Sequence, residues 1–186
     1  QYGINVPPYG ISTNVDDAVN KAKQIGFPSV AKIVSAEILH KTDVKGVKVG
    51  INSELEIHEA FDEMYDRLSR QFEVKGVLIE KMMPAGVAEL IIGLQNDPQF
   101  GPIIMLGLGG IYTEIFRDVS FRVLPITKKD AEEMLENLKG KQILKGFRGS
   151  QAVNTDVISN ALVNIGNLGI DMAPYYESID FNPVIV

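Results

Sequence analysis

The sequence has no cysteine, and only two of its 186 residues are histidine. The lack of cysteine excludes disulfide bonds, thiolate metal sites and a cysteine nucleophile. Lysine and arginine form no long run, and the formal net charge is −6, so the positive field of a dedicated nucleic-acid or membrane-surface binder is missing. No apolar run approaches the roughly 18 residues of a membrane span, and the first residues do not resemble a signal peptide. We therefore expect a soluble, cytoplasmic protein without nucleic-acid or membrane partners, whose basic residues bind anions only locally.

Hydrophobic residues make up 45% of the chain, enough for one sizeable core or two small lobes. An apolar stripe with helical spacing follows Thr13 and Asp16, which resemble a helix-start pair. A strand is expected from Ser29, a second at residues 46–51, and then a helix of about five turns. The buried face of that helix is expected to comprise Ile57, Ala60, Phe61, Met64, Tyr65 and Leu68. These elements form a first lobe, residues 1–78.

Four strand candidates follow, separated by glycine, proline and aspartate signals. They are GVLIEKM at 76–82, AELIIGLQ at 88–95, PIIMLGLG at 102–109 and the stretch from Val119 to Ile126. Helices are expected at 130–139 and 156–168, before a last strand, SIDFNPVIV, at 178–186. Strands dominate this second lobe, residues 79–186, and its helices come late, so the pattern predicts an α+β fold rather than a doubly wound parallel sheet. The hinge is expected at residues 80–84.

Lys32 lies in the otherwise apolar stretch SVAKIVS, where an ammonium group is unfavourable unless it meets an anion or reaches solvent. It could bind an anion, or it could be an ordinary lysine on an edge strand. The glycine cluster at residues 107–111 would let a backbone approach a phosphate, although most such clusters are tight turns. Five acids fall at strand ends or turns and are expected to be mostly ordinary surface carboxylates: Glu80, Glu89, Asp97, Glu114 and Asp118.

Asp180 and Asn182 alternate with apolar residues in the last strand candidate. Side chains two apart on a strand point to the same face, so this carboxylate and this amide oxygen would stand together. Two oxygen donors suit Mg²⁺, which normally completes its coordination with nucleotide phosphates and water. The alternative is the polar outer face of an edge strand.

His40 lies in SAEILHKTDVKGVKVG, residues 35–50, which reads as a turn between two strands. A neutral imidazole is a good nucleophile towards phosphoryl groups, and its pKa allows it to be deprotonated near neutrality. The alternative is an ordinary polar loop residue. His58, on a charged helix, is expected to have no chemical role.

Six blocks occur in the order KIVSAEILHKTDVKGVKVGI, VLIEKM, AELIIGLQNDPQFGP, MLGLGGIYTEIFRDVSFRVLPI, LKGFRG and DFNPV. Together they resemble the ATP-grasp subunit of ADP-forming acyl-CoA synthetases, typically acetate–CoA ligases. A more distant similarity is to the nucleotide-binding subunit of succinyl-CoA synthetase. The resemblance covers nearly the whole chain. It implies the ATP-grasp fold, in which two α+β lobes hold a nucleotide between them, with Mg²⁺ as cofactor and ATP or ADP as substrate.

The resemblance also implies roles for single residues. His40 would be a second phosphoryl carrier, Asp180 the acid that faces the phosphohistidine, and Asn182, with Asp180, a ligand of Mg²⁺. The residues implied to bind the nucleotide are Lys32, Lys41, Gly46, Glu80, Lys81, Met82, Glu89, Gly109, Gly110 and Glu114. Where relatives often have two glycines in the loop over the phosphates, this chain has Lys45 and Gly46.

The resemblance implies a partner, the CoA-binding alpha subunit, which carries the family's first phosphohistidine. Family members also continue past the NPV strand to a further magnesium-binding aspartate, so the chain is expected to be a fragment that does not complete the reaction by itself. That reaction interconverts acyl-CoA, ADP and phosphate with acid, CoA and ATP. Two alternatives stay open: a regulatory, non-catalytic ATP-grasp module paired with an acyltransferase, and another ATP-grasp ligase that makes an amide or thioester through an acyl phosphate.

Overall fold

The computed structural model describes residues 2–109, 118–146 and 151–186. The chain divides into two compact units, which we call the N-terminal unit, Val6–Pro84, and the C-terminal unit, Ala85–Val186 with Gln1–Asn5. The division expected from the sequence, after residue 78, falls inside strand β4 (Gly76–Lys81) of the N-terminal unit. Each unit contains an antiparallel sheet and helices, so the predicted α+β class is confirmed.

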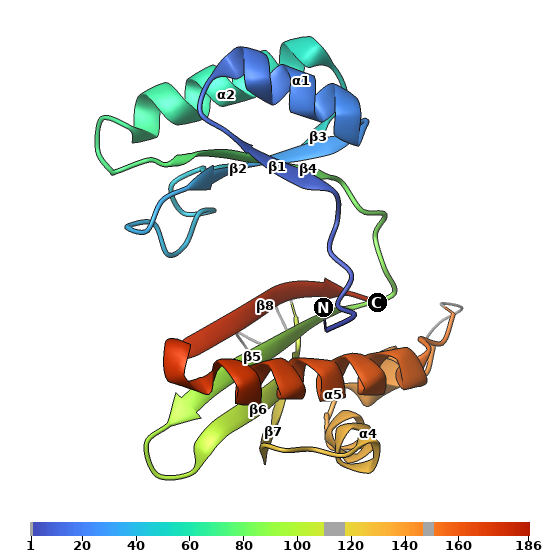
Figure 1. The fold of residues 1–186 in the computed structure, drawn as a ribbon. Coiled ribbons are helices and arrows are strands. Elements are labelled where there is room, and N and C mark those ends of the chain that lie inside the picture. The colour runs from blue at the N-terminus through green and yellow to red at the C-terminus, as the bar shows by residue number, and fades with distance from the viewer. Residues whose placement is uncertain (1, 110–117, 147–150) are drawn as a thin grey trace. The chain divides into compact units, whose positions relative to one another are not determined.

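The N-terminal unit is one four-stranded antiparallel sheet covered on one face by two helices (Figure 1). Its elements are β1 (Tyr9–Ser12), α1 (Val15–Ile25), β2 (Ser29–Val34), β3 (Val47–Ile51), α2 (Glu54–Leu68) and β4. The strand order is β1-β4-β2-β3. The sequence analysis was wrong in dividing the β4 residues between the two lobes, because β4 pairs with β1 and β2 of the N-terminal unit. It also missed β1, whose short sequence YGIS follows two prolines and contains a glycine.

Helix α1 begins one residue later than the sequence pattern indicated. Asn14 is its N-cap, and the Asn14 side chain accepts a hydrogen bond from the Asp17 N–H at 2.9 Å. The expected apolar face of α2 is confirmed, because its members are buried in the unit's core or, for Tyr65, packed against that core. These helices bury Ala31 and Ile33 of β2 beneath them, which fixes the direction of every other side chain on that strand.

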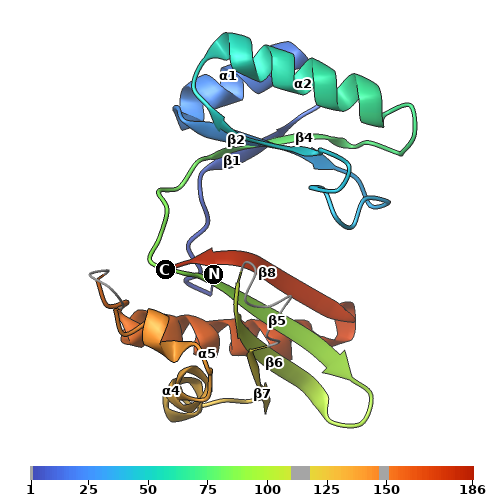
Figure 2. The same cartoon turned by 180° about the vertical axis from the view of Figure 1, so that it is seen from behind.

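The C-terminal unit repeats the plan of one antiparallel sheet with helices on one face (Figures 1 and 2). Its strands are β5 (Glu89–Asp97), β6 (Gly101–Leu108), β7 (Val119–Val123) and β8 (Ser178–Ile185), in the order β7-β6-β5-β8. Its helices are α4 (Lys128–Glu136) and α5 (Thr155–Met172), with short 3-10 helices at Lys141–Ile143 and Ala173–Tyr175. Alternate residues of β5 and β6 form the core with α4 and α5. None of the helices in the described part of the chain is both long and apolar enough to cross a membrane.

Candidate functional site

Lys32 points away from the helices of the N-terminal unit. Its neighbours Ala31 and Ile33 are 1% and 0% exposed beneath α1 and α2, so strand alternation sends Lys32 to the open face of the sheet. Strand β2 has a partner on each side, which excludes the edge-strand explanation for this lysine. The Lys32 ammonium forms an ion pair with the carboxylate of Glu80 on β4, and both side chains are partly buried. In this structure the lysine charge is therefore compensated by an acid.

His40 lies in residues 35–46, which connect β2 to β3 and which we call the histidine loop. The loop extends from the sheet on the side opposite α1 and α2 (Figures 1 and 2). Strand alternation directs Lys32 to the same side. Ile38 anchors the loop in the core with 5% of its surface exposed, whereas Leu39 is 85% exposed and His40 is exposed beside it. The loop thus has a fixed base and presents the imidazole to solvent.

The histidine loop ends in a tight turn that has the hydrogen-bond pattern of a helix C-terminus. The Gly46 N–H donates to the Lys41 carbonyl at 2.7 Å, and the Lys45 N–H donates to the Thr42 carbonyl at 3.0 Å. Lys45 adopts the left-handed conformation, with φ of 50°, that this turn requires. A Cβ at Gly46 would lie 2.6 Å from Ile33 Cγ2, so only glycine fits there. Lys45 therefore takes the place where glycine is usual, and the turn still forms.

The last residue of β4, Lys81, and the residue after it, Met82, are held by backbone groups of their own unit. The Lys81 N–H donates to the Pro8 carbonyl at 2.9 Å, and the Met82 N–H donates to the Pro28 carbonyl at 3.0 Å. The Lys81 ammonium donates to the Phe27 carbonyl at 2.7 Å. Those two backbone donors are already satisfied, so a ligand at this segment would meet carbonyl groups and side chains there.

Glu89 and Gly109, which the sequence predicts near the nucleotide, are neighbours in the C-terminal unit. Glu89 begins β5 and is exposed, and the Gly109 N–H donates to its carbonyl at 2.6 Å. A Cβ at Gly109 would lie 3.0 Å from the Glu89 Cβ, so the close approach of the two backbones favours glycine. Gly110 and Glu114, predicted beside them, lie outside the described residues.

The expected alternation of β8 is present up to Asn182 but is wrong at Pro183, which was expected to face the core and is exposed, because the pairing with β5 shifts register there. Ile179, Phe181 and Val184 pack against the core of the C-terminal unit, whereas Asp180 and Asn182 are exposed. Two oxygen-bearing side chains therefore stand on the face of the sheet opposite α4 and α5. Strand β8 is an edge strand, as the alternative interpretation required. Within the described ranges, no cluster of three or more His, Cys, Asp or Glu side chains forms a metal site, so any metal here would need further ligands.

Asp118 and Arg67 each bind the backbone of a distant loop, and the sequence analysis did not predict either contact. Asp118 was assigned to the surface carboxylates, but it is 4% exposed and accepts hydrogen bonds from the N–H groups of Lys139 at 2.7 Å and Gly140 at 2.8 Å. Arg67, in the last turn of α2, donates to two carbonyls of the histidine loop. An acid directly before a strand is common on protein surfaces and does not indicate that Asp118 is buried. No local pattern indicates the contact of Arg67.

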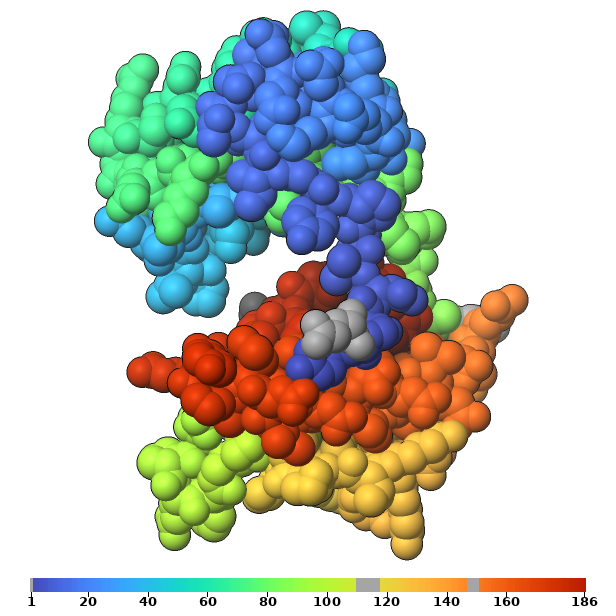
Figure 3. Space-filling view, viewed as in Figure 1, coloured from blue at the N-terminus to red at the C-terminus, as the bar shows by residue number. Residues whose placement is uncertain are grey.

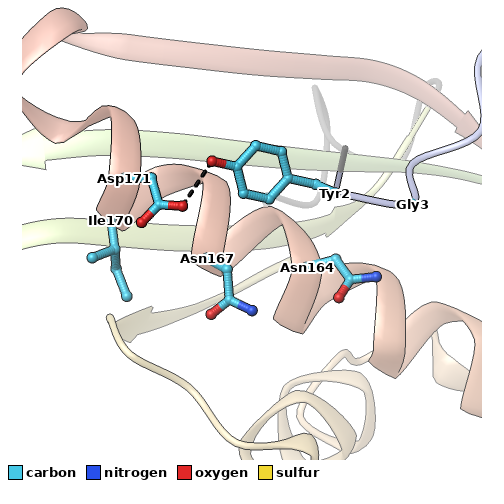
Figure 4. A pocket seen from close by; sticks show the side chains of 6 residues that line it. All are labelled: Tyr2, Gly3, Asn164, Asn167, Ile170 and Asp171. Carbon is cyan, nitrogen blue, oxygen red and sulfur yellow. Dashed lines mark hydrogen bonds between the residues drawn. The ribbon is translucent and has the colours of Figure 1, made fainter.

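The N-terminal segment lies against the surface of the C-terminal unit (Figure 3), and an open pocket lies between this segment and α5. Figure 4 shows the side chains that line it, which come from Tyr2, Gly3, Asn164, Asn167, Ile170 and Asp171. The Tyr2 hydroxyl donates to Asp171 Oδ2 at 2.7 Å, and this hydrogen bond raises the pKa of Tyr2. None of the residues predicted from the sequence to act in a site lines this pocket.

Comparison with known proteins gives matches over the whole chain. The ATP-grasp domain family matches residues 1–186. The beta subunit of ADP-forming acetate–CoA ligase I from Pyrococcus furiosus is 44% identical over 98% of this chain and 79% of the subunit. ADP-forming acetate–CoA ligase I from Archaeoglobus fulgidus is also 44% identical, but the chain spans only 27% of its length. A structure of acetyl-coenzyme A synthetase 1 from Ca. Korarchaeum cryptofilum matches with a TM-score of 0.93 at 44% identity, over 99% of this chain and 81% of that one.

These matches show that the two helix-covered antiparallel sheets form an ATP-grasp fold. Within that fold class, the chain belongs to the family of the beta subunits of ADP-forming acetate–CoA ligases. The resemblance found in the sequence is thereby confirmed.

Proposed function

We propose that the chain is the nucleotide-binding part of a cytoplasmic ADP-forming acyl-CoA synthetase that interconverts acyl-CoA, ADP and phosphate with acid, CoA and ATP. The observation that carries this proposal is the place of His40, exposed at the tip of an anchored loop on the sheet face that also bears Lys32. A nucleophilic imidazole and a cation on one face are the groups that phosphoryl transfer needs. The partner would be the CoA-binding alpha subunit of the same synthetase.

The chemical step assigned to this chain is phosphoryl transfer between His40 and the nucleotide. Towards ATP, a phosphoryl group on a ring nitrogen of His40 passes to a terminal oxygen of ADP. The N–P bond breaks, an O–P bond forms, and the imidazole leaves as the neutral base. In reverse, the neutral imidazole attacks the γ-phosphorus of ATP and ADP departs. Lys32 would exchange its contact with Glu80 for the phosphates and so reduce their negative charge.

Asp180 and Asn182 fit a magnesium ion in their chemistry. A carboxylate and an amide oxygen, both exposed on one face of β8, are ligands that Mg²⁺ accepts, and its remaining positions are normally filled by phosphate oxygens and water. When bound, the ion would neutralise charge on the nucleotide phosphates. Asp180 would also hold the imidazole of a phosphohistidine in orientation, as a buried acid does for a catalytic histidine.

Each unit carries residues that we propose contact a nucleotide. In the C-terminal unit they are Glu89 and Gly109, with Gly110 and Glu114 near them in the sequence. In the N-terminal unit they are Lys41, Gly46 and the segment Glu80–Met82. A second structure of the Ca. Korarchaeum cryptofilum synthetase, 43% identical with a TM-score of 0.80, is a complex with coenzyme A and Mg-AMPPCP, with the phosphohistidine segment pointing towards the nucleotide binding site. This relative supports a nucleotide and Mg²⁺ as ligands of the present chain.

The two other interpretations have less support. A regulatory module would have no need to retain Lys32, His40, Asp180 and Asn182, and a ligase that acts directly through an acyl phosphate needs no exposed histidine in the loop after β2. Neither alternative explains why the loop presents an imidazole.

Coexpression with a CoA-binding alpha subunit tests the proposal. The purified complex should form ATP from acetyl-CoA, ADP and phosphate, and the chain alone should not, because the first phosphohistidine would come from the partner. Replacement of the exposed His58 by alanine serves as the control and should leave the rate unchanged. Full activity of the chain alone would contradict the two-part enzyme, and a complex that binds ATP without acyl-CoA-dependent turnover would support the regulatory module.

A further inference from the structure

The exit of the histidine loop is held by one side chain of helix α2. Arg67 donates from Nη1 to the Val44 carbonyl at 2.8 Å and from Nη2 to the Lys45 carbonyl at 2.9 Å. The planar guanidinium presents these donors in a fixed geometry, and hydrogen bonds from an ionised donor are stronger than neutral ones. Two successive carbonyls are thereby tied to the last turn of a helix that packs in the core.

The held residues lie where the loop is least stable by itself. Lys45 has φ of 50°, a conformation that side chains other than glycine, asparagine and aspartate rarely adopt. Its side chain is exposed, so no packing compensates for the strained backbone. The loop entry has its own attachment, since Glu37 Oε2 accepts a hydrogen bond from the Glu73 N–H at 2.7 Å. The tip with His40 lies between these two attachments.

We infer that Arg67 is a positioning residue for His40. Arg67 holds the exit of the histidine loop, so that the imidazole stays on the open face of the sheet. The observed contacts of the Arg67 guanidinium are with the backbone carbonyls of Val44 and Lys45, so we infer that it acts on His40 through the loop backbone. The role rests on the proposed function, since it assumes that His40 carries a phosphoryl group. The clamp itself is a feature of the loop and can be tested without any reaction.

The clamp is tested by amide hydrogen exchange at Lys45 and Gly46 in the full chain. Arg67→Gln should speed exchange there by about tenfold, because these N–H groups close the turn that the guanidinium supports. Arg70→Gln is the matched control, since Arg70 lies one turn further on, is exposed, and makes no hydrogen bond or ion pair within the described part of the chain. Equal exchange in the two variants would overturn the clamp.

The positioning role is tested by the rate at which the chain takes label from γ-labelled ATP. Arg67→Gln should slow labelling of His40 about tenfold with Mg·ATP affinity unchanged. Adding Lys45→Gly should restore much of both loop protection and labelling, because glycine takes the left-handed conformation without strain. The positioning role would be overturned if Arg67→Gln took label as fast as Arg70→Gln. It would also be overturned if Lys45→Gly failed to restore labelling and Arg67→Gln had a lowered melting temperature. If the unsubstituted chain takes no label, the proposed function fails, whereas the exchange result still decides whether the clamp exists.

Discussion

Lys32 and Glu80 form an ion pair on the open face of the N-terminal sheet, between the adjacent strands β2 and β4. The register pairs Lys32 with Leu78 and Val30 with Glu80, so the two charged residues are diagonal neighbours on one face. Because Lys32 and Glu80 lie far apart in the sequence, no local pattern predicts this contact. The proposed binding of phosphate at Lys32 would therefore compete with a carboxylate of the same sheet.

This competition predicts opposite effects of two substitutions. Glu80→Gln should tighten binding of tripolyphosphate, a probe without an adenine, several-fold, because the ammonium is no longer compensated, whereas Lys32→Met should weaken it at least tenfold. Titration calorimetry at low ionic strength measures both. Lys48→Met, on the neighbouring strand β3, is the control and should change little. Weaker binding in Glu80→Gln, without loss of folded protein, would show that Lys32 is not the phosphate ligand.

If Asn182 is a magnesium ligand, its removal should lower nucleotide affinity only when Mg²⁺ is present. Asn182→Ala should weaken Mg·ADP binding about tenfold and leave metal-free ADP binding almost unchanged, since the amide oxygen would contact the ion and not the nucleotide. Calorimetry in magnesium and in a chelator separates the two cases. Asn160→Ala, which removes an exposed amide from α5, should have no effect in either buffer. An equal loss with and without the metal would indicate damage to β8 instead.

The turn that ends the histidine loop predicts stability changes of opposite sign at adjacent positions. Lys45→Gly should stabilise the chain by about 1 kcal/mol, because glycine accepts the left-handed conformation. Gly46→Ala should destabilise it by about 1–3 kcal/mol, because a Cβ would meet Ile33 Cγ2 at 2.6 Å. Urea unfolding of both variants is the measurement. Destabilisation by Lys45→Gly would mean that the lysine side chain makes a contact stronger than the backbone strain.

Asp118 should be far less tolerant of substitution than a surface acid. Asp118→Asn puts an NH₂ group against one of two backbone donors in a site that is 4% exposed, and should lower the free energy of unfolding by about 1–3 kcal/mol. Asp156→Asn is the comparison, because that side chain is 70% exposed in its ion pair with Lys128 and should cost at most about 0.5 kcal/mol. Similar losses in the two variants would show that the Asp118 hydrogen bonds contribute little.

The spacing of apolar residues in the sequence predicted which faces of α2 and β8 are buried. The apolar stripe of α2 and the alternation of β8 up to Asn182 are both present, because burial on one face repeats with the period of the element. The expected lobe boundary cut through strand β4, because nothing within GVLIEKM specifies the partners of this strand. Its place between β1 and β2 depends on pairing with residues about 45 to 70 positions earlier in the chain.

In the candidate site, too, local features were predicted and contacts between distant segments were not. His40, Lys32, Asp180 and Asn182 were identified from the sequence, because each is a chemically distinct residue in an element of clear type. The Arg67 clamp and the buried state of Asp118 were not, because both depend on where a loop meets a distant element. An arginine near a helix end and an acid before a strand are common on protein surfaces, and only tertiary contacts distinguish these two.

The central claim is that His40 accepts a phosphoryl group, and acid lability of the label on this chain tests it most directly. A phosphohistidine survives base and is lost in brief acid treatment, unlike a phosphoserine, so label from γ-labelled ATP should follow that pattern on the unsubstituted chain and on His58→Ala. His40→Ala should abolish the label and, with the alpha subunit present, the turnover, while Mg·ATP affinity stays within a few-fold. Acid-labile label that persists in His40→Ala, or near-normal turnover of that variant, would contradict the account.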